Sequence, residues 1–199
     1  MESLRELYRI GRGPSSSHTM GPARAAETFR AAYPDADSFQ VTLYGSLAKT
    51  GKGHLTDVAV EEALAPLPAR ILFDTVVEDL PHPNTMELEA FRLGERLGFW
   101  RVMSVGGGKI EIEGQKEADP PQIYPLSRFS ELKDYCRERD IYLWQYVERC
   151  EGPEIWDYLS EVWEVMKEAV YRGIRRDGEL AGGLRVQRKA MYLNRQRHM

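Results

Sequence analysis

The sequence predicts an α/β fold, with α+β as the alternative, in which a small four-stranded sheet with helices is followed by an all-helical segment. Short runs rich in β-branched and aromatic residues alternate with Ala-, Glu- and Leu-rich runs, and the strand-like runs stop after residue 113. The runs that we interpret as strands are residues 39–44, 70–77, 100–105 and 110–113.

Helices are expected between these strands. The clearest one begins at Pro22 and is ended by Pro34, because proline suits the first turn of a helix but not its interior. Two further helices are expected at residues 58–67 and 87–99. Residues 2–10 alternate only loosely between apolar and charged side chains, so they fit either a short helix or an edge segment.

A proline-rich, polar interval at residues 115–126 is typical of a domain boundary. We therefore expect a first domain at residues 1–125 and a helical segment at residues 126–199. The helices expected in that segment start at Ser130 and cover residues 141–149 and 154–175. The last of them is long and amphipathic. The aromatic side chains of the whole helical segment are expected to lie in a core.

Composition excludes several classes of protein. Apolar residues make up 42% of the chain, and no run of eighteen apolar residues suggests a membrane span. The net charge of −4 gives no reason to expect nucleic acid as a partner. The N-terminus lacks a secretory signal, so we expect a cytoplasmic protein. Its cysteines, Cys136 and Cys150, have no CxxC spacing and are interpreted as ordinary thiols.

A glycine-rich stretch, residues 45–57, follows the first predicted strand and precedes a helix-like run. Glycines let a backbone approach a ligand closely, and a helix N-terminus favours negative charge. The stretch is not a nucleotide P-loop, because five residues separate Gly45 from Gly51 and no Ser or Thr follows the lysine. Its candidate functional side chains are Lys52, His54, Thr56 and Asp57. The alternative interpretation is a flexible turn with solvated polar residues.

Two other turns carry polar side chains. One places several hydrogen-bonding residues before the helix that begins at Pro22, a position where anions bind; they are Ser15, Ser16, Ser17, His18 and Thr19. In the other, His82 lies between two prolines and is followed by Asn84. The alternatives are a solvated Ser-rich linker and a solvent-exposed turn histidine. Three histidines at turns beside core elements are what a proton-transfer site requires.

The motifs GPSSSHTMGPARAA, LYGSLAKTGKGHLTD and HPNTM resemble, in order, those of the bacterial iron–sulfur-dependent L-serine dehydratases. The resemblance covers the β domain of that family, roughly residues 1–125. The helices after residue 130 and the segment Ala181–Val186 with Lys189 and Ala190 resemble the start of its α domain. The β domain of this family is similar in fold to a small effector-binding domain of certain phosphoglycerate dehydrogenases.

This resemblance implies an L-serine ammonia-lyase that forms pyruvate and ammonia with a [4Fe-4S] cluster and without pyridoxal phosphate. The cluster's cysteine ligands belong to the part of the α domain that this chain lacks. The resemblance therefore implies an α domain or subunit as partner, a homodimer, and an isolated chain that is inactive.

Candidate roles follow from the chemistry. Loss of the α-proton and the β-hydroxyl of serine needs a base and a Lewis acid. His54 is our candidate base, a position that the resemblance also implies, with Asp57 orienting its ring. The hydroxyls of residues 15–19 are expected to bind the substrate carboxylate with help from Lys52. His82 and Asn84 are expected to contact the polar ends of the amino acid. The competing hypothesis is a serine-sensing module without catalysis; a phosphate-binding enzyme is a third.

Overall fold

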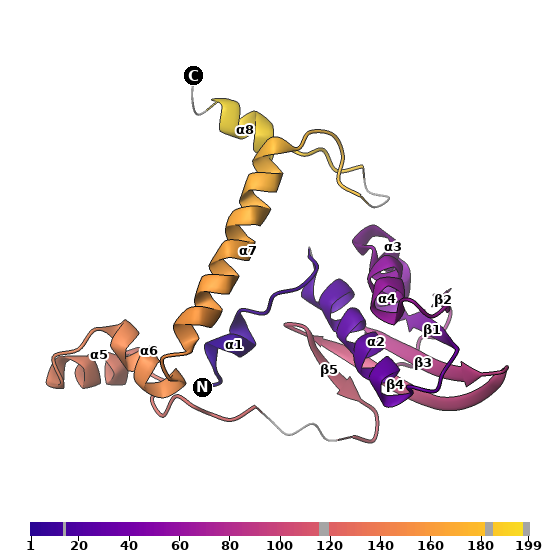
Figure 1. Cartoon of the computed structure of the whole chain (residues 1–199), viewed down its shortest axis with the longest axis horizontal. Coiled ribbons are helices and arrows are strands. Elements are labelled where there is room, and N and C mark those ends of the chain that lie inside the picture. Colours follow the sequence, from indigo (N-terminus) through magenta and orange to yellow (C-terminus); the bar gives the residue numbers. More distant parts are fainter. Residues whose placement is uncertain (14, 116–119, 182–184, 197–199) are drawn as a thin grey trace. The chain divides into compact units, whose positions relative to one another are not determined.

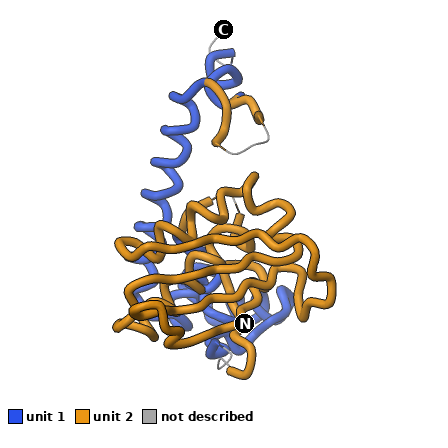
Figure 2. The backbone as a smooth tube through the Cα atoms, turned by 90° about the vertical axis from the view of Figure 1, so that its right-hand side faces the viewer, with its two compact units in different colours: residues 1–10, 118–177, 189–199 blue, residues 11–117, 178–188 orange. Residues whose placement is uncertain are grey.

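The computed structural model describes residues 1–13, 15–115, 120–181 and 185–196. It divides into two compact units, one formed by residues 11–117 and 178–188 and the other by residues 1–10, 118–177 and 189–199 (Figure 2). We call the first the sheet unit and the second the helical unit. The predicted boundary interval and the glycine pair of the tail motif, Gly182 and Gly183, fall partly or wholly outside the described residues.

The sheet unit contains a five-stranded sheet in the order β2-β1-β3-β4-β5. β1 and β2 are parallel, and the other neighbouring pairs are antiparallel. The strands are β1 Ser38–Tyr44, β2 Ala69–Asp74, β3 Thr85–Arg92, β4 Glu95–Gly106 and β5 Lys109–Ile112. The mixed α/β class is therefore confirmed, with five strands rather than the expected four.

Three helices cover one face of this sheet (Figure 1): α2 Gly21–Ala32, α3 Gly45–His54 and α4 Thr56–Leu64. Inward-facing residues of β1 and β3 alternate with polar ones, so that one face carries Val41, Leu43 and Leu88 into the core. Phe29 of α2 is fully buried there, and its ring lies 5.1 Å from that of Trp100.

The other face of the sheet carries a hydrogen-bonded group of polar side chains beside the exposed apolar residues Phe99 and Val105. Glu87 accepts hydrogen bonds from Tyr44 Oη at 2.7 Å and from Arg101 Nη2 at 2.8 Å. Burial, together with the hydrogen bond to Glu87, raises the pKa of Tyr44 to about 12. Helices thus cover one side of the sheet, and the other side exposes both hydrogen-bonded polar residues and apolar ones.

The helix expected at residues 87–99 is wrong. Those residues form most of β3 and the start of β4, joined at Leu93 and Gly94, both of which have positive φ. The local sequence is rich in Glu, Leu and Arg, which favour helices. However, Met86, Leu88 and Ala90 are buried and alternate with Glu87 and Glu89, a period of two that burial against the helices selects.

The glycine-rich loop expected at residues 45–57 is also not a loop. It forms α3 and the start of α4, separated by Leu55 in the left-handed conformation. Leu47, Ala48 and Gly51 share the buried side of α3. The glycine at position 51 allows close packing, because a Cβ there would meet Thr56 and Phe73. Packing therefore overrides the low helix propensity of glycine.

The helical unit contains α1 Leu4–Leu7, α5 Phe129–Glu138, α6 Leu143–Glu151, α7 Ile155–Arg175 and α8 Ala190–Gln196 (Figure 1). α5, α6 and α7 confirm the helices expected there. The expectation that the aromatic residues of this segment lie in a core is confirmed for Tyr146, which is buried, and wrong for Trp144, Trp156, Trp163 and Tyr171, which are exposed. Among the described residues, no helix has both the length and the apolar character that a bilayer span requires.

Candidate active site

The N-terminus of α3 and the proline-flanked histidine turn meet at Gly45. β1 ends at Tyr44, and Gly45 turns the chain into α3 with φ +52°, in the left-handed region. A Cβ at position 45 would overlap the carbonyl oxygen of Pro83. The glycine therefore lets the two segments touch, and the N–H of Ser46 donates to that oxygen at 2.7 Å.

The serine-rich motif forms a π-helical turn, η1 Ser16–Met20, which runs directly into α2. The side chain of Ser15 caps this turn by accepting a hydrogen bond from the N–H of His18 at 3.0 Å. π-Helical turns are rare and occur frequently at functional sites. The alternative of a solvated Ser-rich linker is excluded, because Thr19 is fully buried and His18 is half-buried.

His18 lies between two hydroxyl groups. Its Nε2 is 3.0 Å from Ser46 Oγ, and its Nδ1 is 3.0 Å from Ser17 Oγ. A hydroxyl group both donates and accepts, so both hydrogen bonds persist whichever ring nitrogen carries the proton. The ring is therefore fixed in place while its proton is free to exchange between the two nitrogens.

His54, the last residue of α3, lies against His18. The two ring centroids are 4.7 Å apart, with an angle of 47° between the ring planes. Burial and the charge of His54 lower the pKa of His18, and a hydrogen bond to the main chain of Ser46 opposes them in part. At neutral pH His18 is therefore uncharged, and the pair can hold a proton without a second positive charge beside it.

Lys52 and Asp57 form an ion pair at the junction of α3 and α4. Lys52 Nζ is 3.3 Å from Asp57 Oδ2 and 4.8 Å from the ring centroid of Phe73. The other carboxylate oxygen of Asp57 accepts a hydrogen bond from the N–H of Val58 at 3.0 Å. In the part of the chain that the structure describes, Asp57 is thus bound to Lys52 and not to the ring of His54.

The proline-flanked turn is fixed internally and against β4. His82 Nδ1 accepts a hydrogen bond from the N–H of Asn84 at 3.0 Å, so the proton of the neutral ring lies on Nε2. Asn84 Nδ2 donates to the carbonyl of Ser104 at 3.2 Å, and the N–H of Ser104 donates to the carbonyl of Asn84 at 2.9 Å. The alternative of a freely solvated turn histidine is excluded by these bonds.

Buried polar groups without a partner gather around these motifs. Among the described residues, the side-chain oxygens of this kind are Thr19 Oγ1, Thr56 Oγ1, Asn84 Oδ1 and Ser104 Oγ. Each such group destabilises a fold by about 1–3 kcal/mol, so their concentration beside the motifs is typical of a functional site. Three of the four are candidates from the sequence.

The structure thus brings His18 and His54 together and joins the histidine turn to them through Ser46. No contact links His82 to the histidine pair among the described residues. Sequence reasoning missed Ser46 and Ser104. Ser46 had a detectable signal, since it follows a glycine between a strand and a polar stretch. Ser104 had none, because it lies within an ordinary strand pattern.

The iron–sulfur cluster implied by the resemblance does not fit the donors in this chain. Such clusters are held mainly by about four cysteine thiolates, whereas the sequence has two cysteines. Both cysteines are free thiols, and within the described residues no three His, Cys, Asp or Glu side chains form a group suited to a metal ion.

Comparison with known proteins identifies the family. Residues 3–66 match the sequence profile described as serine dehydratase beta chain. The chain is 32% identical to L-serine dehydratase 2 of Escherichia coli (strain K12), in an alignment that covers 98% of this chain and 54% of that relative. L-serine dehydratase 1 of the same organism is also 32% identical, with the same coverage. The identity to an L-serine dehydratase of Mycobacterium bovis is 34%, over 94% of this chain and 52% of that relative.

The chain spans about half the length of these relatives. The matched profile covers η1, α2, β1, α3 and α4, the elements that carry the histidine pair. These matches show a β domain of the bacterial L-serine dehydratase type in this chain.

Proposed function

We propose that this chain provides the amino-acid-binding and proton-transfer site of an L-serine ammonia-lyase, which converts L-serine into pyruvate and ammonia. The observation that carries the proposal is the contact between His18 of η1 and His54 at the end of α3, with ring centroids 4.7 Å apart. The similarity to these relatives supports serine as the substrate, since they are named L-serine dehydratases.

His54 is the proposed base. It takes the proton from Cα of L-serine, the electron pair of that C–H bond forms the Cα–Cβ double bond, and the β-hydroxyl group leaves. The resulting enamine is hydrolysed to pyruvate and ammonia. His18 stays uncharged beside it, because burial and the charge of His54 lower the pKa of His18.

The serine-rich turn is the proposed site for the substrate carboxylate. Ser16 is exposed at the start of η1, whereas Ser15 and Ser17 are already bound to the main chain and ring of His18. Lys52 adds positive charge, although its pairing with Asp57 offsets part of that charge. His82 and Asn84 are proposed to contact the amino group, with Thr56 and Thr19 supporting the same site.

The cluster of the family is proposed to be held by cysteines that are not among the residues of this chain. An α domain or subunit would supply them, which makes that domain, together with a second copy of the enzyme, the proposed partners. A cytoplasmic location and the inactivity of this chain alone remain predictions of the same proposal.

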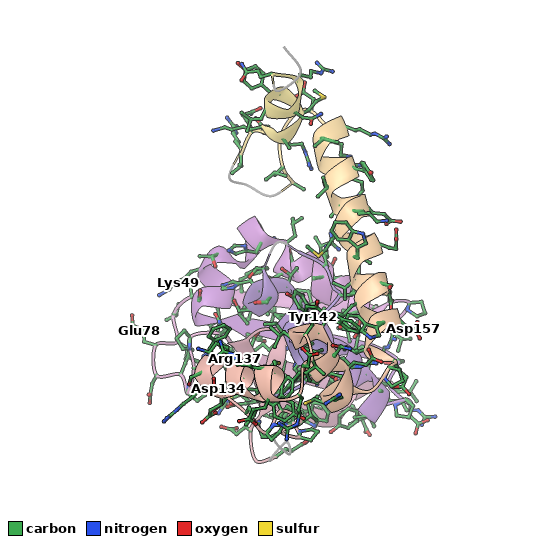
Figure 3. All side chains as sticks on the ribbon, turned by 90° about the vertical axis from the view of Figure 1, so that its left-hand side faces the viewer. Lys49, Glu78, Asp134, Arg137, Tyr142 and Asp157 are labelled. Carbon is green, nitrogen blue, oxygen red and sulfur yellow. The ribbon has the colours of Figure 1, made fainter. Side chains whose placement is uncertain are left out.

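Calorimetric titration of L-serine into this chain tests the site, with D-serine as the stereochemical control. The expected result is binding of L-serine that is weakened, but not abolished, in His54→Ala. Lys49→Ala is the matched control, because Lys49 lies on the exposed side of the same helix (Figure 3). Equal binding by wild type and His54→Ala would contradict the assignment, and so would equal binding of the two enantiomers.

Turnover assays on the enzyme assembled with its α domain distinguish the serine-sensing alternative from catalysis. If His54 is the base, His54→Ala abolishes turnover while other determinants of serine binding persist. If the site only senses serine, the variant retains turnover and changes its cooperativity with serine concentration.

A further inference from the structure

Ser46 links the two segments that carry the histidine pair. We infer that Ser46 is a positioning residue that holds the imidazole of His18 against His54, an inference that rests on the proposed proton-transfer role of the pair. Ser46 Oγ is 3.0 Å from His18 Nε2, across 28 positions of sequence. The hydroxyl thus ties η1 to the first turn of α3.

The main chain of Ser46 is itself fixed. Its N–H donates to the carbonyl of Pro83 at 2.7 Å, and the preceding Gly45 permits that approach because it has no Cβ. Its carbonyl accepts a hydrogen bond from Thr50 Oγ1 at 2.8 Å within α3. A side chain on so constrained a backbone presents its hydroxyl at a defined position, as a positioning residue must.

The other contacts of the His18 ring do not replace this bond. Ser17 Oγ, at 3.0 Å from Nδ1, is the adjacent residue of the same turn and moves with it. Ser15 Oγ binds the main-chain N–H of His18 and leaves the ring free to rotate. His54 contacts the ring from α3 with its own ring tilted by 47°, an approach that fixes no hydrogen-bond direction. Ser46, through its hydroxyl and its main chain, therefore makes the directional contacts that orient the ring relative to α3, and Ser46→Ala removes the hydroxyl contact alone.

A hydroxyl partner suits a residue that exchanges protons. It accepts from a protonated Nε2 and donates to an unprotonated one, so the ring stays oriented through a change of charge. A hydrogen bond from a charged ring is stronger than one from a neutral ring, so the hydroxyl favours the protonated form. The main chain of Ser46 acts in the same direction, since its hydrogen bond raises the pKa of His18 against burial and the charge of His54.

The test is an NMR titration of the ring protons of His18 and His54 in this chain. Ser46→Ala is expected to lower the pKa of His18 by about 0.5 to 1, because the charged ring loses a hydrogen-bond acceptor. Ser46→Thr, which keeps the hydroxyl, is expected to restore it, and Ser46→Cys to lie between them. Thr50→Ala is the matched control, because it lies on the same helix and its hydroxyl binds the Ser46 carbonyl rather than the ring.

Titration of L-serine into the same variants measures the consequence for binding. Ser46→Ala is expected to weaken the affinity about three- to tenfold, with recovery in Ser46→Thr. If Ser46→Ala and Ser46→Cys leave the His18 titration as in the wild type, the inference is overturned. If wild type fails to bind L-serine, the proposed function fails, whereas the histidine titration still decides the role of Ser46.

Discussion

The two units of the chain differ in how their apolar residues are used. In the sheet unit, residues from three helices and four strands share one core, and Phe29, Leu47 and Leu88 are fully buried. In the helical unit, the described apolar side chains that are buried are Tyr124, Tyr146, Ile155 and Val162. The helices of the sheet unit therefore close a core, whereas α5, α6 and α7, which are more strongly amphipathic, leave large apolar side chains exposed.

Polar contacts hold much of the helical unit together. Glu151 at the end of α6 accepts hydrogen bonds from the N–H of Leu4 at 2.6 Å, from Ser3 Oγ at 2.7 Å and from Tyr124 Oη at 2.7 Å. Beside this carboxylate lies a cavity of about 610 Å³ with mainly apolar lining residues, among them Leu4 and Tyr146. An amphipathic pattern thus predicts a helix and an apolar face, but not the surface that covers the face.

Phe29→Ala and Trp163→Ala give the largest contrast between the units. Loss of the fully buried Phe29 side chain is expected to lower the free energy of unfolding of the sheet unit by about 3–5 kcal/mol. Trp163, 57% exposed on α7, is expected to change the stability of its unit by less than about 0.5 kcal/mol. Hydrogen exchange of β1 and α7 amides in urea measures the free energy of unfolding of each unit separately. A large loss in Trp163→Ala would mean that the apolar face of α7 is covered in solution.

Gly45→Ala tests the close approach of the two site segments. The substitution places a Cβ against the Pro83 carbonyl and also strains a backbone with φ +52°, so we expect a loss of about 2–4 kcal/mol. Gly94→Ala is the matched control, since Gly94 has φ +85° and nothing lies within 4 Å of the point that its Cβ would occupy. It is expected to lose about 1–2 kcal/mol from strain alone. Equal losses in urea unfolding would show that the Pro83 contact is unimportant.

Glu151→Gln tests the polar network of the helical unit, where we expect a loss of about 1–2 kcal/mol at pH 7. Partial burial acts to raise the pKa of Glu151, but hydrogen bonds from Leu4, Ser3 and Tyr124 outweigh it and hold that pKa below its ordinary value. A lowered pKa stabilises the folded state above the ordinary carboxyl pKa, and this stabilisation is lost as the pH falls through the folded value.

The wild type should therefore lose stability of the helical unit as the pH falls below about 4.5, and Glu151→Gln should lose less. Glu161→Gln is the control, because Glu161 is exposed on α7. Urea unfolding of the helical unit at a series of pH values measures the effect. Identical pH profiles for the wild type and Glu151→Gln would exclude the network as a source of stability.

Prediction from sequence succeeded where the deciding interaction is local. Pro22 and Pro34 bracket α2, and the long amphipathic period of residues 154–175 matches α7. β1 is recognisable from its own residues, since aromatic and β-branched side chains fit a pleated, half-buried surface. The candidate histidines were also identified locally, from their places beside breaks in the regular pattern.

Prediction failed where packing between segments far apart in the sequence determines the secondary structure. Residues 87–99, which are rich in Glu, Leu and Arg, form most of β3 and the start of β4 because their alternating side chains are buried against α2 and α3. The glycine-rich residues after Tyr44 become α3 because Leu47 and Gly51 pack against the sheet and α4. Local propensities of these segments amount to a fraction of a kcal/mol per residue, less than the burial that opposes them.

The residue types and their order establish which imidazoles, hydroxyls and charges this protein has, and that its motifs are those of L-serine dehydratases. Folding places His18 against His54, brings Ser46 to His18, and pairs Asp57 with Lys52. Hydrogen bonds and ring contacts act over only a few ångströms. Folding alone brings side chains separated by tens of residues within that range.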